Sequence, residues 1–169
     1  MPTTDCNQIR FSFHPEFPIV VSADAPRMSS DGGLLLLRQA DDRLGLSRWI
    51  AECVPDARDA TRVEHDRLEQ VRQRLYQIAM GYEDCNDADH LRDDPMFKVA
   101  CDRSPESDGA LSSQPTLSRL ENAVTGKALR RLRERFEQAY VDGLPADTEQ
   151  VVLDIDSTDD ETHGHQQLS

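Results

Sequence analysis

The sequence predicts a mainly α-helical protein with a few short strands, an α+β fold. Apolar residues recur at three- and four-residue spacing through most of residues 31–143, which is the helical period. Short β-branched or aromatic segments occur at residues 9–23 and 149–158. The length of 169 residues, with 37% hydrophobic and 30% charged residues, fits one ordinary domain or a small domain with an appendage.

The N-terminal part predicts two short strands or extended segments, "IRFSFHP" and "FPIVVSA", both punctuated by proline. The following stretch, "SSDGGLLLLRQADDRLGL", changes to a helical period. Ser30 or Asp31 is expected to cap this helix, and Gly45 is expected to end it in the left-handed conformation.

The middle of the chain predicts a short helix from Ser47 that stops before Pro55, and then the clearest amphipathic helix, residues 66–80. The apolar face expected for this second helix is Leu68, Val71, Leu75, Ile78 and Ala79.

Punctuating residues set the next boundaries. Asp94 before Pro95 predicts an N-cap followed by a first-turn proline, and thus a helix over residues 95–102. The stretch 102–114 has the composition of a loop. Two further helices are expected, one opening at Pro115 and a longer one ending at Gly143.

The last apolar segment, "EQVVLDIDST" (149–158), predicts a strand with Asp154 and Asp156 on one face and Leu153 and Ile155 on the other. A strand this apolar needs a neighbouring strand on each side, yet only thirteen residues follow Asp156. The sheet is therefore expected to be incomplete.

The net charge of −13 argues against a protein that coats nucleic acid, but the charge is uneven. Residues 113–141 hold six Lys or Arg against three Glu, which is compatible with local phosphate contact, whereas residues 142–169 hold eight acids and no Lys or Arg.

No apolar run approaches the roughly 20 residues of a membrane span, and no secretory signal is evident. The four scattered cysteines form no CxxC pair. These observations lead us to expect a cytoplasmic protein with reduced thiols and no membrane partner.

Three interpretations of the acidic strand remain open from the residues alone. Asp and Ser at a strand end can be turn formers ahead of a solvated acidic tail. Asp-x-Asp-x-Thr at 154–158 is also the signature of haloacid-dehalogenase-like phosphatases, in which Asp154 would be the nucleophile and Asp156 the general acid. Alternatively, a metal-dependent nuclease would use Asp156 at the strand end to bridge two Mg²⁺ ions.

Four blocks in order, "SSDGGLLLLRQADDRLGLSRWIAECVPDARD", "YQIAMGYEDCNDADHLRDDPMFKVA", "SSQPTLSRLEN" and "VVLDIDSTDDETHGHQQ", resemble bacterial insertion-sequence transposases of the DDE type. The group that they resemble is transposase DDE domain group 1. The resemblance implies a helical N-terminal region, residues 1–145, that leads into the first strand of an RNase H-like catalytic domain at 146–169, where the chain looks truncated.

The resemblance also implies a chemistry, the cutting and joining of DNA at insertion-sequence ends with Mg²⁺ or Mn²⁺. Asp156 matches the first acid of the catalytic triad and would be a metal ligand, whereas Asp154 matches no family acid. The second Asp and the final Glu of the triad are not found here, so the fragment is expected to be inactive and not to bind the metal tightly. The alternative is a non-catalytic helical module that binds DNA or a full-length transposase, or self-associates.

The segment "SSQPTLSRLEN" supplies candidate DNA contacts, because a helix there would turn Thr116, Ser118, Arg119 and Asn122 outward. Arg130 in the following helix would extend the cationic surface. The plainer alternative is a capped helix with solvated polar residues, since the loop before it is longer than the turn of a helix-turn-helix motif.

Overall fold

The computed structural model describes residues 8–16, 18–22, 31–106 and 109–155. These residues form a mainly helical fold with one two-stranded sheet, which confirms the predicted α+β class in its coarse form. The elements are β1 (Gln8–Phe11), β2 (Ile19–Ser22), α1 (Gly33–Leu44), α2 (Leu46–Cys53), η1 (Ala60–Arg62), α3 (Arg67–Ala79), η2 (Cys85–Asp87), α4 (Ala88–Leu91), α5 (Pro95–Ala100), α6 (Gln114–Asn122) and α7 (Gly126–Asp142).

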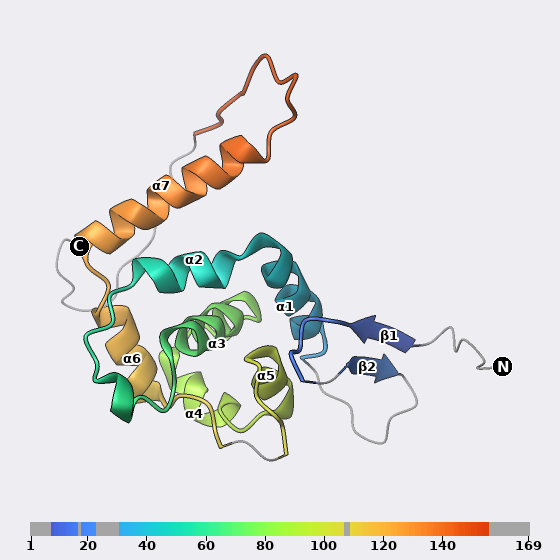
Figure 1. The fold of residues 1–169 in the computed structure, drawn as a ribbon, viewed down its shortest axis with the longest axis vertical. Helices are drawn as coiled ribbons and strands as arrows, with labels where there is room; N and C mark the ends of the chain where they lie inside the picture. Colours follow the sequence, from blue (N-terminus) through green and yellow to red (C-terminus); the bar gives the residue numbers. More distant parts are fainter. Residues whose placement is uncertain (1–7, 17, 23–30, 107–108, 156–169) are drawn as a thin grey trace.

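The two predicted strands form an antiparallel hairpin in which Phe11 pairs with Ile19. The hairpin lies beside α1 and α5 at one side of the molecule (Figure 1). Phe11 and Phe13 are buried together with Leu35 of α1, so the hairpin is attached to the helical body by a small aromatic core. β-branched and aromatic residues therefore serve two purposes here, strand formation and burial.

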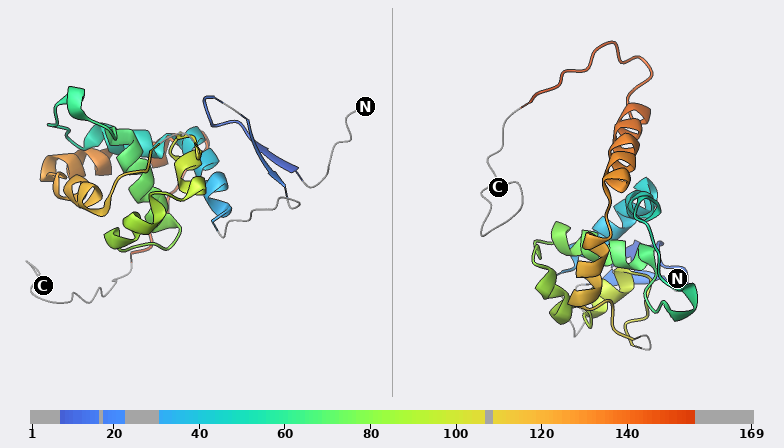
Figure 2. Two further views of the ribbon diagram at one scale, coloured as in Figure 1. Left: turned by 90° about the horizontal axis from the view of Figure 1, so that it is seen from below. Right: turned by 90° about the vertical axis from the view of Figure 1, so that its left-hand side faces the viewer.

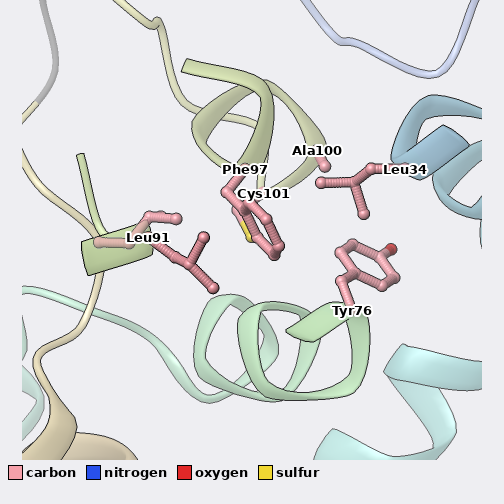
Figure 3. Packing of buried hydrophobic residues seen from close by; sticks show 7 residues of the cluster. Leu34, Tyr76, Leu91, Phe97, Ala100 and Cys101 are labelled. Atoms are coloured by element: carbon pink, nitrogen blue, oxygen red, sulfur yellow. The ribbon is translucent and has the colours of Figure 1, made fainter. Parts of the chain in front are cut away.

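Helix α3 runs through the middle of the body, with the other short helices around it (Figures 1 and 2). Its Tyr76 is fully buried in the largest apolar cluster, where Figure 3 shows the ring near Leu34 of α1 and Phe97 of α5. Helix α7 packs against α2 and extends away from this body (Figure 1). No helix among the described residues is long and apolar enough to cross a membrane.

The helix boundaries expected at Asp94 and Gly45 are confirmed, whereas the cap expected at Asp31 is wrong. The Asp94 carboxylate accepts hydrogen bonds from the amides of Met96 and Phe97 at the start of α5, and Gly45 ends α1 with φ at 71°. Asp31 does not cap α1, because the N-cap is Gly32 and makes no side-chain cap bond. The buried Asp31 carboxylate instead accepts a hydrogen bond from the Tyr82 hydroxyl. Ser30, the other candidate cap, lies outside the described residues.

The buried face of α3 differs from the expected apolar stripe. Its bounds agree with the prediction, but Ile78 is 49% exposed and Ala79 is exposed too. The buried side includes three glutamines, Gln70, Gln73 and Gln77. The Gln73 amide donates to the carbonyl of Ser112 and accepts from its backbone N–H, both at 2.9 Å. A polar side chain on α3 thus holds the end of the long loop before α6, which an apolar count cannot reveal.

The strand expected at 149–158 is not formed in its described part. Residues 148–155 adopt no helix or strand, and the side chains of Val152, Leu153 and Ile155 are 82%, 76% and 88% exposed. A strand requires a partner for its backbone hydrogen bonds, and no described strand lies in register with this segment. The rest of the segment, 156–158, lies outside the described residues.

Candidate nucleic-acid interface

A groove on the body joins the segment after α2 to the exposed side of α6. It consists of two adjoining hollows of about 400 and 450 Å³ that share Arg58, Gln70 and Thr116. Arg62 lines one hollow, and Arg119 lines the other. Guanidinium groups from two separate elements thus surround one concave surface, an arrangement suited to phosphate oxygens.

The first wall of the groove, residues 55–67, is held in place by its own charges. The Asp56 carboxylate accepts from Arg58 at 2.6 and 2.7 Å and pairs with Arg67 at 3.1 Å. Arg58 also donates to the backbone carbonyl of His65 at 2.9 Å. Asp59 caps η1 by accepting from the amide of Thr61. These local bonds replace a buried core in a segment that is mostly exposed.

The charge of Asp56 in this wall is fixed at neutral pH. The hydrogen bonds from Arg58 hold the pKa of Asp56 far below its usual range, against a smaller opposing effect of burial. Asp56 therefore remains an anion and offsets part of the charge of Arg58 and Arg67. Arg62 and Arg119 make no ion pair with any described residue and are exposed, so their cationic charge is available to a ligand.

The second wall is α6, whose buried face is Leu117 and Leu120. Thr116 and Arg119 lie on the flank that faces residues 55–67, which places both in the groove. Ser118 and Asn122 lie together on the adjacent face, where the Asn122 amide donates to the carbonyl of Ser118 at 2.8 Å. Four of the five candidate DNA contacts thus share α6, and two of these line the groove.

Arg130, the fifth candidate, is separate from this site. It is an exposed residue of α7. The structure therefore divides the predicted cationic stretch between a groove residue, Arg119, and a different helix.

Residue-level reasoning missed the arginines of the first wall, Arg58, Arg62 and Arg67. The reason is their setting, because residues 55–67 also contain Asp56, Asp59, Glu64 and Asp66 and have no basic excess. The four-residue spacing of Arg58 and Arg62 between turn-forming residues is a signal that could have identified these two arginines as neighbours. Which of these arginines form ion pairs, and that Arg62 forms none with a described residue, depends on tertiary contacts. The sequence alone therefore does not predict it.

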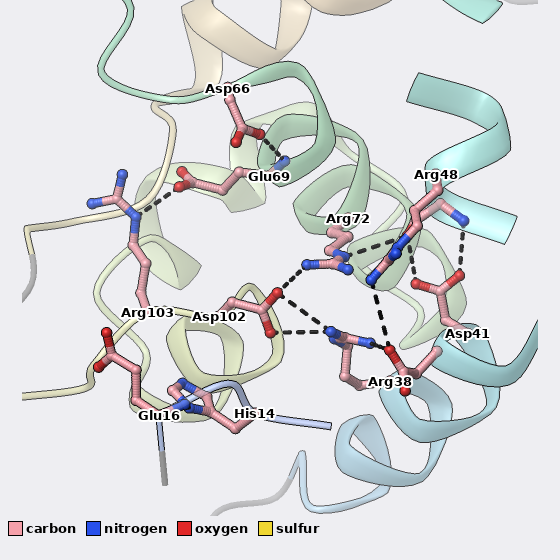
Figure 4. A network of polar contacts seen from close by, with 12 residues as sticks. His14, Glu16, Arg38, Asp41, Arg48, Asp66, Glu69, Arg72, Asp102 and Arg103 are labelled. Atoms are coloured by element: carbon pink, nitrogen blue, oxygen red, sulfur yellow. Dashed lines mark hydrogen bonds and ion pairs between the residues drawn. The ribbon is translucent and has the colours of Figure 1, made fainter. Parts of the chain in front are cut away.

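A second cluster of arginines is structural (Figure 4). Arg38 of α1 and Arg72 of α3 are 1% and 4% exposed, and both pair with the carboxylate of Asp102, which follows α5. On its other side Arg72 approaches the hydroxyl of Ser47, which donates to Asp41 at 2.6 Å. Side chains this deeply buried cannot reach a nucleic-acid backbone, so this network supports the body and not the groove.

The predicted catalytic and metal-binding acid, Asp156, lies outside the described residues. Asp154 is described and exposed. Among the residues that the structure describes, no group of three His, Cys, Asp or Glu side chains converges to hold a metal ion. The described part of the chain therefore offers a groove for an anionic ligand and no assembled metal centre.

Comparison with known families gives a match over nearly the whole chain. The sequence model of the family described as transposase DDE domain group 1 matches residues 11–169. No curated protein and no solved structure matches the chain significantly. The matched range includes β2, the groove residues and Asp156.

Proposed function

The chain belongs to the transposase DDE domain group 1 family, and from this premise we propose that its helical body binds DNA in the groove between residues 55–67 and α6. The family acts by cutting and joining DNA and generally uses divalent metal ions. DNA is therefore the expected ligand of an anion-binding surface on this chain. We assign residues 1–145 to a DNA-holding region and residues 146–169 to the start of the catalytic domain.

The observation that supports this proposal most directly is the pair Arg62 and Arg119. They come from opposite walls of one groove, are exposed, and have no acidic partner among the described side chains. Phosphate contacts position a protein on DNA without reading its sequence. Thr116 adds a hydroxyl and Arg58 adds a third guanidinium to the same surface.

The role of Asp156 follows from its place in the family motif. We propose that it is the first catalytic acid and a ligand of Mg²⁺ or Mn²⁺. Two-metal chemistry requires carboxylates from several elements around ions about 3.5–4 Å apart. No second or third family acid is matched within residues 1–169, so a polypeptide limited to these residues is proposed to bind DNA without cutting it.

The second candidate function is the non-catalytic one, a helical module that binds DNA or a complete transposase. The groove favours it, because none of the described residues 146–155 lines the groove. The two candidates share the groove and differ in whether metal-dependent cleavage occurs.

The experiment is a fluorescence anisotropy titration of labelled duplex DNA at several salt concentrations. Removing two phosphate contacts in the double variant Arg62→Ala/Arg119→Ala should weaken binding and reduce the slope of log K against log salt by about 2. The matched control is Arg10→Ala/Arg43→Ala, which removes two exposed arginines from β1 and α1, away from the groove (Figure 1). Equal losses in both variants would show nonspecific attraction and remove the groove from consideration.

A cleavage assay separates the two candidates. With Mg²⁺ or Mn²⁺ and element-end DNA, residues 1–169 should produce no nicks or joined strands. Metal-dependent cleavage that is lost in Asp156→Ala would show instead that these residues hold a complete site.

A further inference from the structure

Helix α7 presents an apolar face that no described residue covers. Leu129, Phe136 and Tyr140 are 57%, 47% and 56% exposed. Their spacing of seven and four residues places them on one side of the helix. Side chains of this size seldom line up on the surface of a protein without a partner.

The neighbouring side of α7 is already occupied. Ala128 is buried, and the Arg135 guanidinium lies 5.5 Å from the centre of the Trp49 ring of α2. Arg135 also pairs with Glu52 of α2 at 3.8 Å. Packing against α2 therefore fixes α7 on the body. The face of Leu129, Phe136 and Tyr140 is not part of this contact with α2.

The charges along α7 are polarised. Residues 126–135 contain five Lys or Arg and one Glu, whereas residues 136–142, the C-terminal part of the helix, contain two acids and no Lys or Arg. An isolated helix favours the reverse order, with acids near its N-terminus and bases near its C-terminus, because of its macrodipole. The observed order therefore disfavours an isolated α7. It becomes favourable beside an antiparallel helix of the same sequence, where each basic half meets an acidic half and the two dipoles oppose.

We propose that the apolar face of α7 is a self-association surface that binds α7 of a second copy of this chain in antiparallel orientation. Leu129 of each copy lies opposite Tyr140 of the other, with Phe136 near the twofold axis. Such an interface uses the same patch twice, as closed dimers do. The proposal is independent of the proposed DNA groove, since it involves none of the groove residues.

The pair Arg133 and Glu137 borders this face. Within one chain they lie 3.2 Å apart and are 72% and 65% exposed. Across the axis, Arg133 of one copy would approach Glu137 of the other, so the charge pair at the border selects the antiparallel register.

Analytical ultracentrifugation of the full chain over a range of concentrations tests the surface. We expect a monomer–dimer equilibrium that dissociates on dilution, because one helix pair falls below the roughly 1,200 Å² of a standard interface. Leu129→Glu should abolish the dimer. The control is Leu36→Glu, which introduces the same charge on α1 at a leucine that is 59% exposed, and it should leave dimerisation unchanged. A chain that stays monomeric at every concentration, or equal effects of the two variants, would overturn the proposal.

Charge exchange tests the orientation. Arg133→Glu should weaken dimerisation about tenfold or more by opposing like charges, and Arg133→Glu combined with Glu137→Arg should recover it. Failure of the double variant to recover would contradict the antiparallel register. If duplex DNA covers this face instead, the free chain will be monomeric and Leu129→Glu will reduce DNA binding, which also overturns the proposal.

Discussion

Arg38 and Asp102 are joined across 64 positions of sequence by a hydrogen bond of 3.0 Å between a buried guanidinium and a carboxylate. Asp102 also pairs with Arg72, so one carboxylate compensates two buried cations from two helices. The residue holds this place in a left-handed backbone conformation, with φ at 62°. Charge compensation is therefore obtained at the cost of a backbone geometry that non-glycine residues disfavour.

The first prediction separates the charge compensation by Asp102 from its left-handed backbone conformation. Asp102→Ala leaves two buried arginines without one of their partners, so it should lower the free energy of unfolding by about 2–3 kcal/mol. This loss is somewhat smaller than that expected for breaking a fully buried ion pair. Asp102→Gly also removes the carboxylate but relieves the backbone, so its loss should be smaller by about 1 kcal/mol. Urea denaturation measures both, with the exposed Asp93→Ala as control. A larger loss in Asp102→Gly than in Asp102→Ala would contradict the account.

The second prediction concerns alkaline pH. The Tyr76 hydroxyl donates to Asp41 at 2.6 Å in the core. Burial, followed by the contact with Asp41, raises the pKa of Tyr76 far above its usual value. The unfolded chain ionises this tyrosine near pH 10 while the folded chain keeps it neutral, so its contribution to stability is complete below about pH 10 and declines above it.

Thermal unfolding between pH 9 and 11 tests this effect. Tyr76→Phe should be less stable at pH 8, since it leaves a buried carboxylate without one donor, but it should lose less stability than the wild type as pH rises. Tyr140→Phe, which alters an exposed side chain, should follow the wild type. Parallel pH curves for all three proteins would show that Tyr76 does not contribute to the alkaline transition.

The third prediction uses the fixed charge of Asp56. The pKa of this carboxyl is held far below normal by Arg58, so it is ionised wherever DNA binding would be measured. Asp56→Asn removes one anion from the groove and frees part of the charge of Arg58 and Arg67. DNA affinity should therefore rise, with a steeper dependence on salt. Asp93→Asn makes the same charge change outside the groove and should raise affinity less. Equal or lower affinity in Asp56→Asn would mean that these arginines do not contact phosphate.

Local signals predicted the boundaries of this fold well, because caps and turns act over a few residues. Asp94 with Pro95, and Gly45 in the left-handed conformation, are such cases. Asp31 failed as a cap, because the N-cap of α1 is Gly32, and the Asp31 carboxylate accepts a hydrogen bond from the sequence-distant Tyr82. The terminal strand was not formed in its described part, because period-two apolar alternation indicates a strand only if another strand is available to pair with it.

The candidate site was partly predictable for the same reason. Thr116 and Arg119 followed from helical spacing on α6, whereas Arg62 enters the groove through the fold of residues 55–66. The family motif at Asp156 is a short sequence pattern, and its role as the first catalytic acid remains a prediction.

The last prediction compares two glutamines on the same helix. Gln73 and Gln77 of α3 are both fully buried. The Gln73 amide makes two hydrogen bonds with the backbone of Ser112. The amide nitrogen and oxygen of Gln77 have no hydrogen-bond partner among the described residues. A buried polar group without a partner loses its hydration and gains nothing in return.

The same substitution should therefore have opposite effects at the two positions. Gln77→Met keeps an unbranched side chain and removes the unpaired amide, so it should raise the free energy of unfolding by about 1–2 kcal/mol. Gln73→Met leaves the N–H and carbonyl of Ser112 buried without partners and should lower it by about 1–3 kcal/mol. Urea denaturation of the two variants measures the contrast directly. Destabilisation by Gln77→Met similar to that of Gln73→Met would show that the Gln77 amide does have a partner, in solvent or in the part of the chain beyond the described residues.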